Sequence, residues 1–79
     1  MNKRNMKIEI NESQSLDEVV MELERLGYVK REFAVFHSDL GSFVITRSYG
    51  IITWCGESLV SLLWCDCELA TLAELKQMV

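Results

Sequence analysis

The sequence predicts a small α+β domain, and two observations support this class. Helix-start signals occur at Ser15 and Thr71, while the stretch between Tyr28 and Trp54 is rich in β-branched and aromatic residues. We therefore expect the element order β-α-β-β-β-(α)-α, with an antiparallel sheet and helices packed on one face. Residues 1–79 are expected to form a single domain whose residues 1–5 are frayed.

The composition excludes several classes of protein. Hydrophobic residues make up 49% and charged residues 25% of the chain, as in ordinary globular proteins rather than disordered ones. No apolar run approaches the roughly 18 residues that span a bilayer, and the first residues lack the apolar core of a signal peptide. The net charge of −4 and the lack of a basic stripe disfavour direct nucleic-acid binding. We expect a cytoplasmic protein.

Periodicity predicts the first two elements. Residues 7–10 alternate polar and apolar side chains, which is typical of a strand covered on one face. Ser15 and Glu18 have the spacing of a capping box, and Gly27 stands where a helix C-cap residue is expected. Between them, an apolar stripe predicts the buried face of an amphipathic helix: Leu16, Val19, Val20, Leu23 and Leu26.

Three strands and a second helix are expected in the rest of the chain. A strand with Phe33, Val35 and Phe36 should end at the turn sequence 38–41. Residues 43–47 and 51–54 should form a hairpin with a three-residue loop, 48–50, in which Gly50 takes the left-handed position. Residues 58–64 favour one to two helical turns, and a short extended piece at 67–69 precedes a final helix that starts at the Thr71–Glu74 capping box.

The chain resembles short accessory proteins of tailed bacteriophages. The residues that carry the resemblance are Leu26-Gly27-Tyr28, the hairpin segments 44–46 and 50–54, and the terminal stretch 68–75. The resemblance implies an early protein that binds a host protein, such as a defence component, and inhibits or redirects it. It implies no catalytic residue, and it would place the protein in the host cytoplasm.

Cysteines and the single histidine offer a possible metal or catalytic site. His37, Cys55, Cys65 and Cys67 are residue types that bind zinc, but a Cys-x-Cys pair departs from the usual knuckle spacing. The cysteines are more simply explained as small buried hydrophobic residues. Cys55 and His37 are the one plausible nucleophile and base, without an orienting group. We therefore expect no metal, no cofactor and no enzymatic activity.

A protein–protein interaction module is the leading functional prediction. The expected anchor is Trp64 with Leu62 or Leu63, flanked by Asp66 and Glu68. A buried core position or a homodimer contact explains the same apolar residues equally well. The outer face of the first helix is a second candidate surface, formed by Asp17, Met21 and Glu24.

A small-molecule binding protein that acts as an oligomer is the alternative. A nucleotide signal would need phosphate contacts and a stacking surface. The sequence offers these residues for it: Lys30, Arg31, Arg47, Tyr49 and Trp54.

Overall fold

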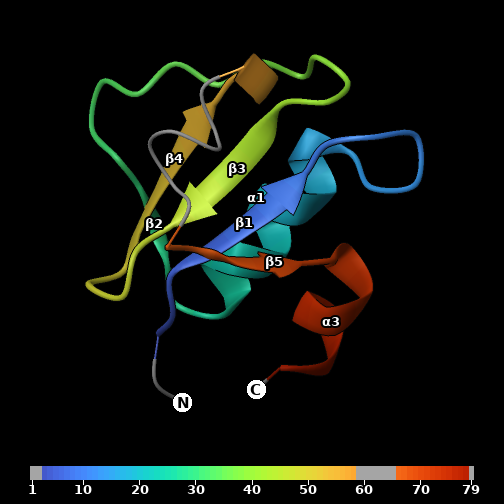
Figure 1. Cartoon of the computed structure of the whole chain (residues 1–79). Coiled ribbons are helices and arrows are strands. Elements are labelled where there is room, and N and C mark those ends of the chain that lie inside the picture. Colours follow the sequence, from blue (N-terminus) through green and yellow to red (C-terminus); the bar gives the residue numbers. More distant parts are fainter. Residues whose placement is uncertain (1–2, 59–65, 79) are drawn as a thin grey trace.

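The computed structural model describes residues 3–58 and 66–78 and confirms the α+β class. The described residues form a five-stranded mixed sheet with helices α1 and α3, whose arrangement can be followed in Figure 1. The elements are β1 (Met6–Glu9), α1 (Leu16–Arg25), β2 (Val29–Lys30), β3 (Phe43–Thr46), β4 (Ile51–Cys55), β5 (Glu68–Ala70) and α3 (Leu72–Gln77). Most of the predicted segment 58–64 lies outside the described residues.

The sheet has the strand order β2-β4-β3-β1-β5, and its three central strands, β4, β3 and β1, pair with one another in antiparallel fashion. Both edge strands run parallel: Val29 pairs with Ile51, and Met6 pairs with Glu68. The expectation of a wholly antiparallel sheet was therefore wrong. Helix α1 returns the chain along the sheet between β1 and β2. Strand β2 therefore runs in the same direction as β1 and β4.

The main core lies between the helices and one face of the sheet. Helices α1 and α3 pack against each other, and both contribute side chains to one buried cluster. Its members are Met6, Ile8, Ile10, Val19, Leu23, Tyr28, Val44, Ile52, Ala70, Leu72 and Leu75. A smaller cluster on the opposite face contains Ile45, Cys55 and Cys67, with Phe43 packed against it. Both described helices thus cover the same face of the sheet, as expected.

Helix α1 begins and ends at the residues that its sequence indicates. The Ser15 hydroxyl accepts a hydrogen bond from the Glu18 backbone N–H at 3.3 Å. At the other end Gly27 has a φ of 98°, and its N–H donates to the Glu24 carbonyl at 3.0 Å. The next N–H, of Tyr28, donates to the Leu23 carbonyl at 3.0 Å, which completes a Schellman motif. Local signals therefore set both ends of this helix.

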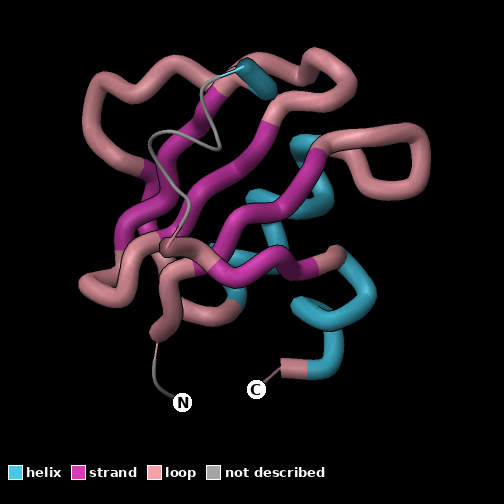
Figure 2. The backbone as a smooth tube through the Cα atoms, in the orientation of Figure 1, coloured by secondary structure: helices cyan, strands magenta, loops and turns pink. Residues whose placement is uncertain are grey.

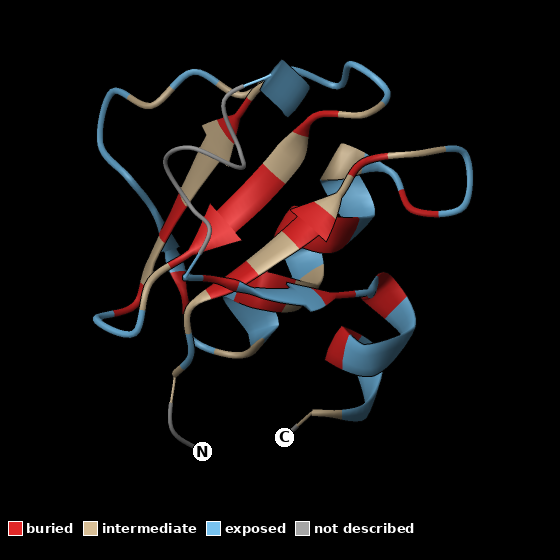
Figure 3. Cartoon of the chain, in the orientation of Figure 1, coloured by how far each residue is buried: buried red, intermediate tan, exposed pale blue. Residues whose placement is uncertain are grey.

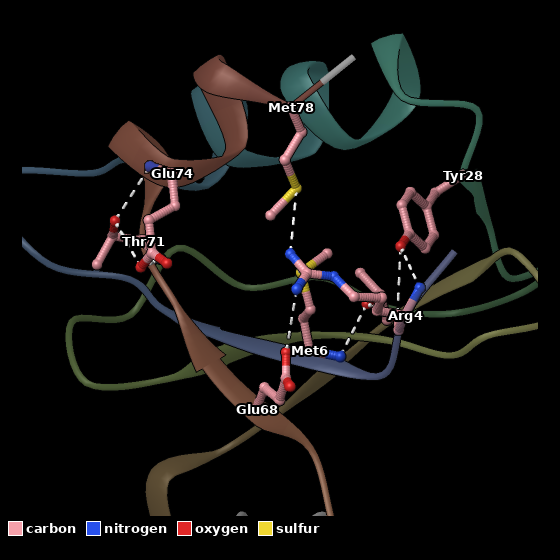
Figure 4. Close-up of polar contacts among 8 residues, drawn as sticks. Arg4, Met6, Tyr28, Glu68, Thr71, Glu74 and Met78 are labelled. Atoms are coloured by element: carbon pink, nitrogen blue, oxygen red, sulfur yellow. Dashed lines mark hydrogen bonds and ion pairs between the residues drawn. The ribbon is translucent and has the colours of Figure 1, made fainter. Parts of the chain in front are cut away.

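The hairpin and the last helix also follow the sequence. Gly50 has a φ of 95°, and its N–H donates to the Arg47 carbonyl at 2.8 Å, so the predicted three-residue loop 48–50 is confirmed. At α3, the Thr71 N–H donates to Glu74 Oε1 at 3.1 Å, while the Glu74 N–H donates to Thr71 Oγ1 at 3.2 Å. Figure 4 shows this reciprocal capping box.

Arg4 joins the start of the chain to four other segments, and Figure 4 shows its contacts with Tyr28, Glu68 and Met78. Its N–H donates to the Tyr28 hydroxyl at 2.8 Å, and its guanidinium lies 3.3 Å from the Glu68 carboxylate and 3.6 Å from Met78 Sδ. Its carbonyl accepts from Thr46 Oγ1 at 2.8 Å. The backbone of Arg4 is therefore held at both its N–H and its carbonyl, while the expected fraying of residues 1–5 stays a prediction.

The expected strand at Phe33, Val35 and Phe36 is absent from the described residues. Strand pairing ends after Lys30, and residues 31–42 form the long loop that joins β2 to β3 in Figure 2. The Ala34 N–H donates to the Arg31 carbonyl at 3.1 Å, which closes a turn and diverts the chain from β4. Figure 3 shows that most of this loop is exposed. The alternating apolar side chains therefore do not mark a buried strand.

Candidate functional site

The most unusual residue of the described chain is Phe33, in the turn that follows β2. It has a φ of 63°, and among the described residues it is the one non-glycine residue with a positive φ. It occupies the third position of the Arg31–Ala34 turn, where a type II turn requires a positive φ and usually contains glycine. The Phe33 side chain is 93% exposed. An aromatic residue thus stands in solvent on strained backbone.

Further exposed apolar residues lie close to Phe33 in the sequence. Val29 on the edge strand β2 is 62% exposed, and Val35 in the loop is 66% exposed. Apolar residues scattered singly over a surface are normal, but a contiguous group suggests an interaction site. We refer to residues 29–36 as the β2 ridge. It presents apolar side chains on both sides of the strained turn.

Two clefts adjoin the β2 ridge. The first, which we call the α1 groove, has a cavity volume of about 350 Å³. Its apolar lining residues are Leu16, Val20, Met21 and Phe36, and its charged ones are Asp17, Glu24 and Lys30. The second, the loop cleft, has a volume of about 450 Å³ and is lined by Arg31, Glu32, Phe33, Ala34, Val35, Thr53 and Trp54. The ridge therefore supplies residues to both clefts.

The predicted acidic surface of the first helix takes part in this site. Asp17, Met21 and Glu24 all line the α1 groove, and Met21 is 60% exposed. Lys30, predicted as a phosphate contact, lies in the same groove. The sequence did not indicate Phe36 as part of this surface, because its apolar spacing predicted a strand instead.

Of the five residues predicted for the partner-binding anchor, the structure describes only Asp66 and Glu68. Leu62, Leu63 and Trp64 lie outside the described residues. Asp66 and Glu68 are exposed, and each forms an ion pair within the chain: Asp66 with Arg47 at 3.1 Å, and Glu68 with Arg4 at 3.3 Å. Both carboxylates therefore have structural partners.

Arg47 organises a small polar group beside the smaller core cluster. Its Nη1 lies 3.4 Å from Asp66 Oδ1 and 3.3 Å from Cys67 Sγ, while Nη2 contacts Asp66 Oδ2. The hydrogen bonds from Arg47 lower the pKa of the Asp66 carboxyl. Burial raises the pKa of the Cys67 thiol, and the nearby Asp66 charge raises it further, so this cysteine stays protonated at neutral pH. Such a thiol is a poor nucleophile.

The predicted small-molecule residues converge only in part. Arg31 and Trp54 line the loop cleft together. Tyr49, which is 75% exposed, lies in the hairpin loop before β4, whereas Trp54 lies near the far end of that strand. A strand rises about 3.3 Å per residue, so the length of β4 separates the two aromatic residues. Arg47 contacts Asp66 and Cys67 on the opposite face of the sheet from Trp54.

The candidate cysteine and histidine residues do not form a common site in the described chain. The His37 ring packs edge-on against Trp54 with ring centroids 4.8 Å apart. Cys55 is buried on the other face of β4, where its thiol donates to the Gly56 carbonyl at 3.4 Å. Within residues 3–58 and 66–78, no group of three or more His, Cys, Asp or Glu side chains is placed to hold a metal ion. Cys65 lies outside the described residues.

Trp54 has one further feature, which bears on the loop cleft. Its indole Nε1 is buried and makes no hydrogen bond to any described part of the chain. A buried indole N–H usually has a partner. The His37 ring packs edge-on against the Trp54 ring, but this contact does not provide a hydrogen-bond acceptor for the indole N–H.

Comparisons with known proteins do not identify this chain. It matches no family model, no curated protein and no solved structure. None of the helices in the described residues is long and apolar enough to cross a membrane. The β2 ridge and the two clefts beside it are therefore the features of the described residues that indicate a function.

Proposed function

We propose that this chain is a non-enzymatic protein-binding module and that the β2 ridge contacts the partner. The observation that carries the proposal is Phe33, an aromatic side chain 93% exposed on a backbone of positive φ. Aromatic residues are frequent among the hot spots of protein interfaces.

Two free-energy costs coincide at this residue. A left-handed conformation costs a non-glycine residue roughly 1–2 kcal/mol. Exposing a Phe side chain forgoes about 1.5–3 kcal/mol that its burial would contribute. Neither the strained backbone nor the exposed side chain stabilises the fold. Burial of Phe33 in a partner would recover the free energy that is lost by exposing its side chain. Backbone strain at a preorganised contact is a known feature of binding sites.

The kind of partner follows from the resemblance to phage accessory proteins. On that basis we propose a host protein as the partner, with inhibition or redirection as the result of occupying its surface. The lack of an assembled catalytic group in the described residues is compatible with this mode of action, because occupancy requires only shape and chemical complementarity.

Replacing Phe33 with glycine tests the proposal without unfolding the protein. Glycine tolerates the positive φ, so Phe33→Gly should raise the free energy of unfolding by up to about 1.5 kcal/mol after the entropy cost of glycine is subtracted. The same substitution should weaken partner binding at least tenfold. Immobilised wild-type and Phe33→Gly proteins would be compared by capture from bacterial lysate, with mass spectrometry of the bound proteins and then measured affinities.

Leu40→Ser is the matched control, because Leu40 is an apolar side chain in the same loop with 64% exposure. It should keep the partner at wild-type affinity. Capture of the same protein by Phe33→Gly at unchanged affinity would refute the role of the ridge. Failure of the wild type to retain any protein in stoichiometric amount would count against a protein-binding function.

Self-association belongs to the same proposal. We infer that a second copy competes with the partner for exposed apolar surface, as a small domain often completes its burial by forming a homodimer. The predicted contact at residues 59–64 remains a prediction.

A small-molecule function is the second candidate, because Arg31 and Trp54 share the loop cleft. A guanidinium and an indole would bind the phosphate and the base of a nucleotide. If this function holds, nucleotides should raise the melting temperature of the wild type but not of Trp54→Leu. Equal shifts for both proteins, or none, would remove this candidate.

A further inference from the structure

The α1 groove runs along the axis of α1. Its helical lining residues stand at positions 16, 17, 20, 21 and 24, which are adjacent rows on one side of the helix. Lys30 and Phe36 come from the β2 ridge and complete the lining. The groove is therefore elongated, and it has an apolar floor between α1 and the ridge that directly follows it in the sequence.

The two carboxylates of the groove lie at opposite ends of its helical wall. Asp17 and Glu24 are seven residues apart on α1, which places them about 10 Å apart along the helix axis. Among residues 3–58 and 66–78, neither carboxylate forms an ion pair or a side-chain hydrogen bond. By contrast, Glu22 on the same helix is paired with Arg25 at 2.8 Å.

Glu24 is placed where a carboxylate does not help the helix. It lies in the last turn of α1, where the partial negative charge of the helix end disfavours another negative charge. Asp17 lies in the first turn, where the helix dipole accounts for it. Helix stability therefore explains Asp17 but not Glu24, and the groove supplies a reason for Glu24.

We propose that the α1 groove binds a short segment of the partner protein in which an apolar side chain stands between two basic ones. The apolar side chain would rest on Leu16, Val20, Met21 and Phe36, and the basic side chains would reach Asp17 and Glu24. This inference rests on the proposed function and names the chemistry of its partner.

Charge complementarity supports this occupant over an acidic or a neutral one. Of the charged residues that line the described groove, two are acidic and one is basic, so the local charge is −1. The whole chain carries −4, which attracts basic segments at longer range. Met21 adds an unbranched side chain that adapts to different apolar partners.

Selection from a random library of displayed 12-residue peptides tests the inference. Immobilised wild-type protein should enrich peptides with Leu, Met or Phe between Lys or Arg residues. A synthetic peptide of the enriched sequence should then shift the backbone amide signals of residues 16–24, Lys30 and Phe36 in NMR titrations. Its affinity should fall as salt rises, because the ion pairs are at the surface.

Two double variants with the same change in net charge separate the groove from the overall field. Asp17→Lys/Glu24→Lys should weaken the peptide at least tenfold. Glu12→Lys/Asp39→Lys changes two exposed carboxylates that do not line the groove, and it should leave the affinity within twofold. Enrichment without basic residues, or equal losses in the two variants, would overturn the inference.

The same variants distinguish this inference from the proposed function. If Phe33→Gly no longer captures the lysate partner but Asp17→Lys/Glu24→Lys still does, the proposed role of the groove is refuted. The protein-binding function would remain intact. Loss in both variants supports both. A wild-type dimer that Asp17→Lys/Glu24→Lys converts to a monomer would identify a second copy as the occupant and overturn the inference.

Discussion

Leu23→Ala is expected to lower the free energy of unfolding by about 2–5 kcal/mol. Leu23 is completely buried in the cluster between the helices and the sheet. Truncation removes its transfer free energy and leaves a cavity that the surrounding β1, β3 and β4 side chains fill only in part. A small domain has roughly 5–15 kcal/mol of stability in total, so the loss should be plain in urea denaturation.

Glu24→Ala is the control on the same helix. Glu24 is exposed, and removing a carboxylate from the last turn of α1 should change stability by no more than about 0.5 kcal/mol. Glu22 is a less suitable control because it forms an ion pair with Arg25. Equal losses for Leu23→Ala and Glu24→Ala would contradict the assignment of the buried face.

Thr46→Val is expected to cost about 1–3 kcal/mol although it hardly changes the side-chain volume. Thr46 is completely buried, its Oγ1 accepts from the Met6 N–H at 3.0 Å, and it donates to the Arg4 carbonyl at 2.8 Å. Valine removes the bond from the buried Met6 N–H to the Thr46 hydroxyl, whereas the Arg4 carbonyl keeps a hydrogen bond from the Tyr28 hydroxyl. Removing one partner of a buried hydrogen bond costs about 1–3 kcal/mol.

Thr53→Val provides the matched comparison, because Thr53 is only partly buried and makes no such pair of bonds within the described chain. It should change stability by about 0.5 kcal/mol or less. Hydrogen exchange would locate the effect, since the Met6 amide should exchange faster in Thr46→Val than in the wild type. Unchanged protection of that amide would refute the role given to the Thr46 hydroxyl.

Local signals predicted the elements whose ends are fixed by nearby residues. Ser15, Gly27, Gly50 and Thr71 each occupy the cap or turn position that the sequence indicated. These positions depend on hydrogen bonds over three to five residues, so single-sequence reasoning can find them. The two main helices and the hairpin follow from such signals.

The β2 ridge could not be found in the same way. The apolar residues Phe33, Val35 and Phe36 have strand-like spacing, and the turn at Phe33 lacks the glycine or asparagine that usually marks a positive φ. The parallel pairing of both edge strands also has no local signature, because it depends on segments far apart in the sequence. The sequence indicated Asp17, Met21 and Glu24 as a surface of the first helix. It did not indicate Phe36 as part of the groove that they line.

The placement of β1 inside the sheet has a consequence for how this chain folds. The partners of Ile8 are Val44, 36 residues later, and Ala70, 62 residues later. During synthesis β1 therefore emerges long before either neighbour, and its backbone groups depend on water until those segments arrive. Loop closure must precede most of the stabilising contacts, so folding should be slower than in a helical bundle of equal length. Until then β1 presents an apolar strand with two open edges, which makes the nascent chain a substrate for chaperones.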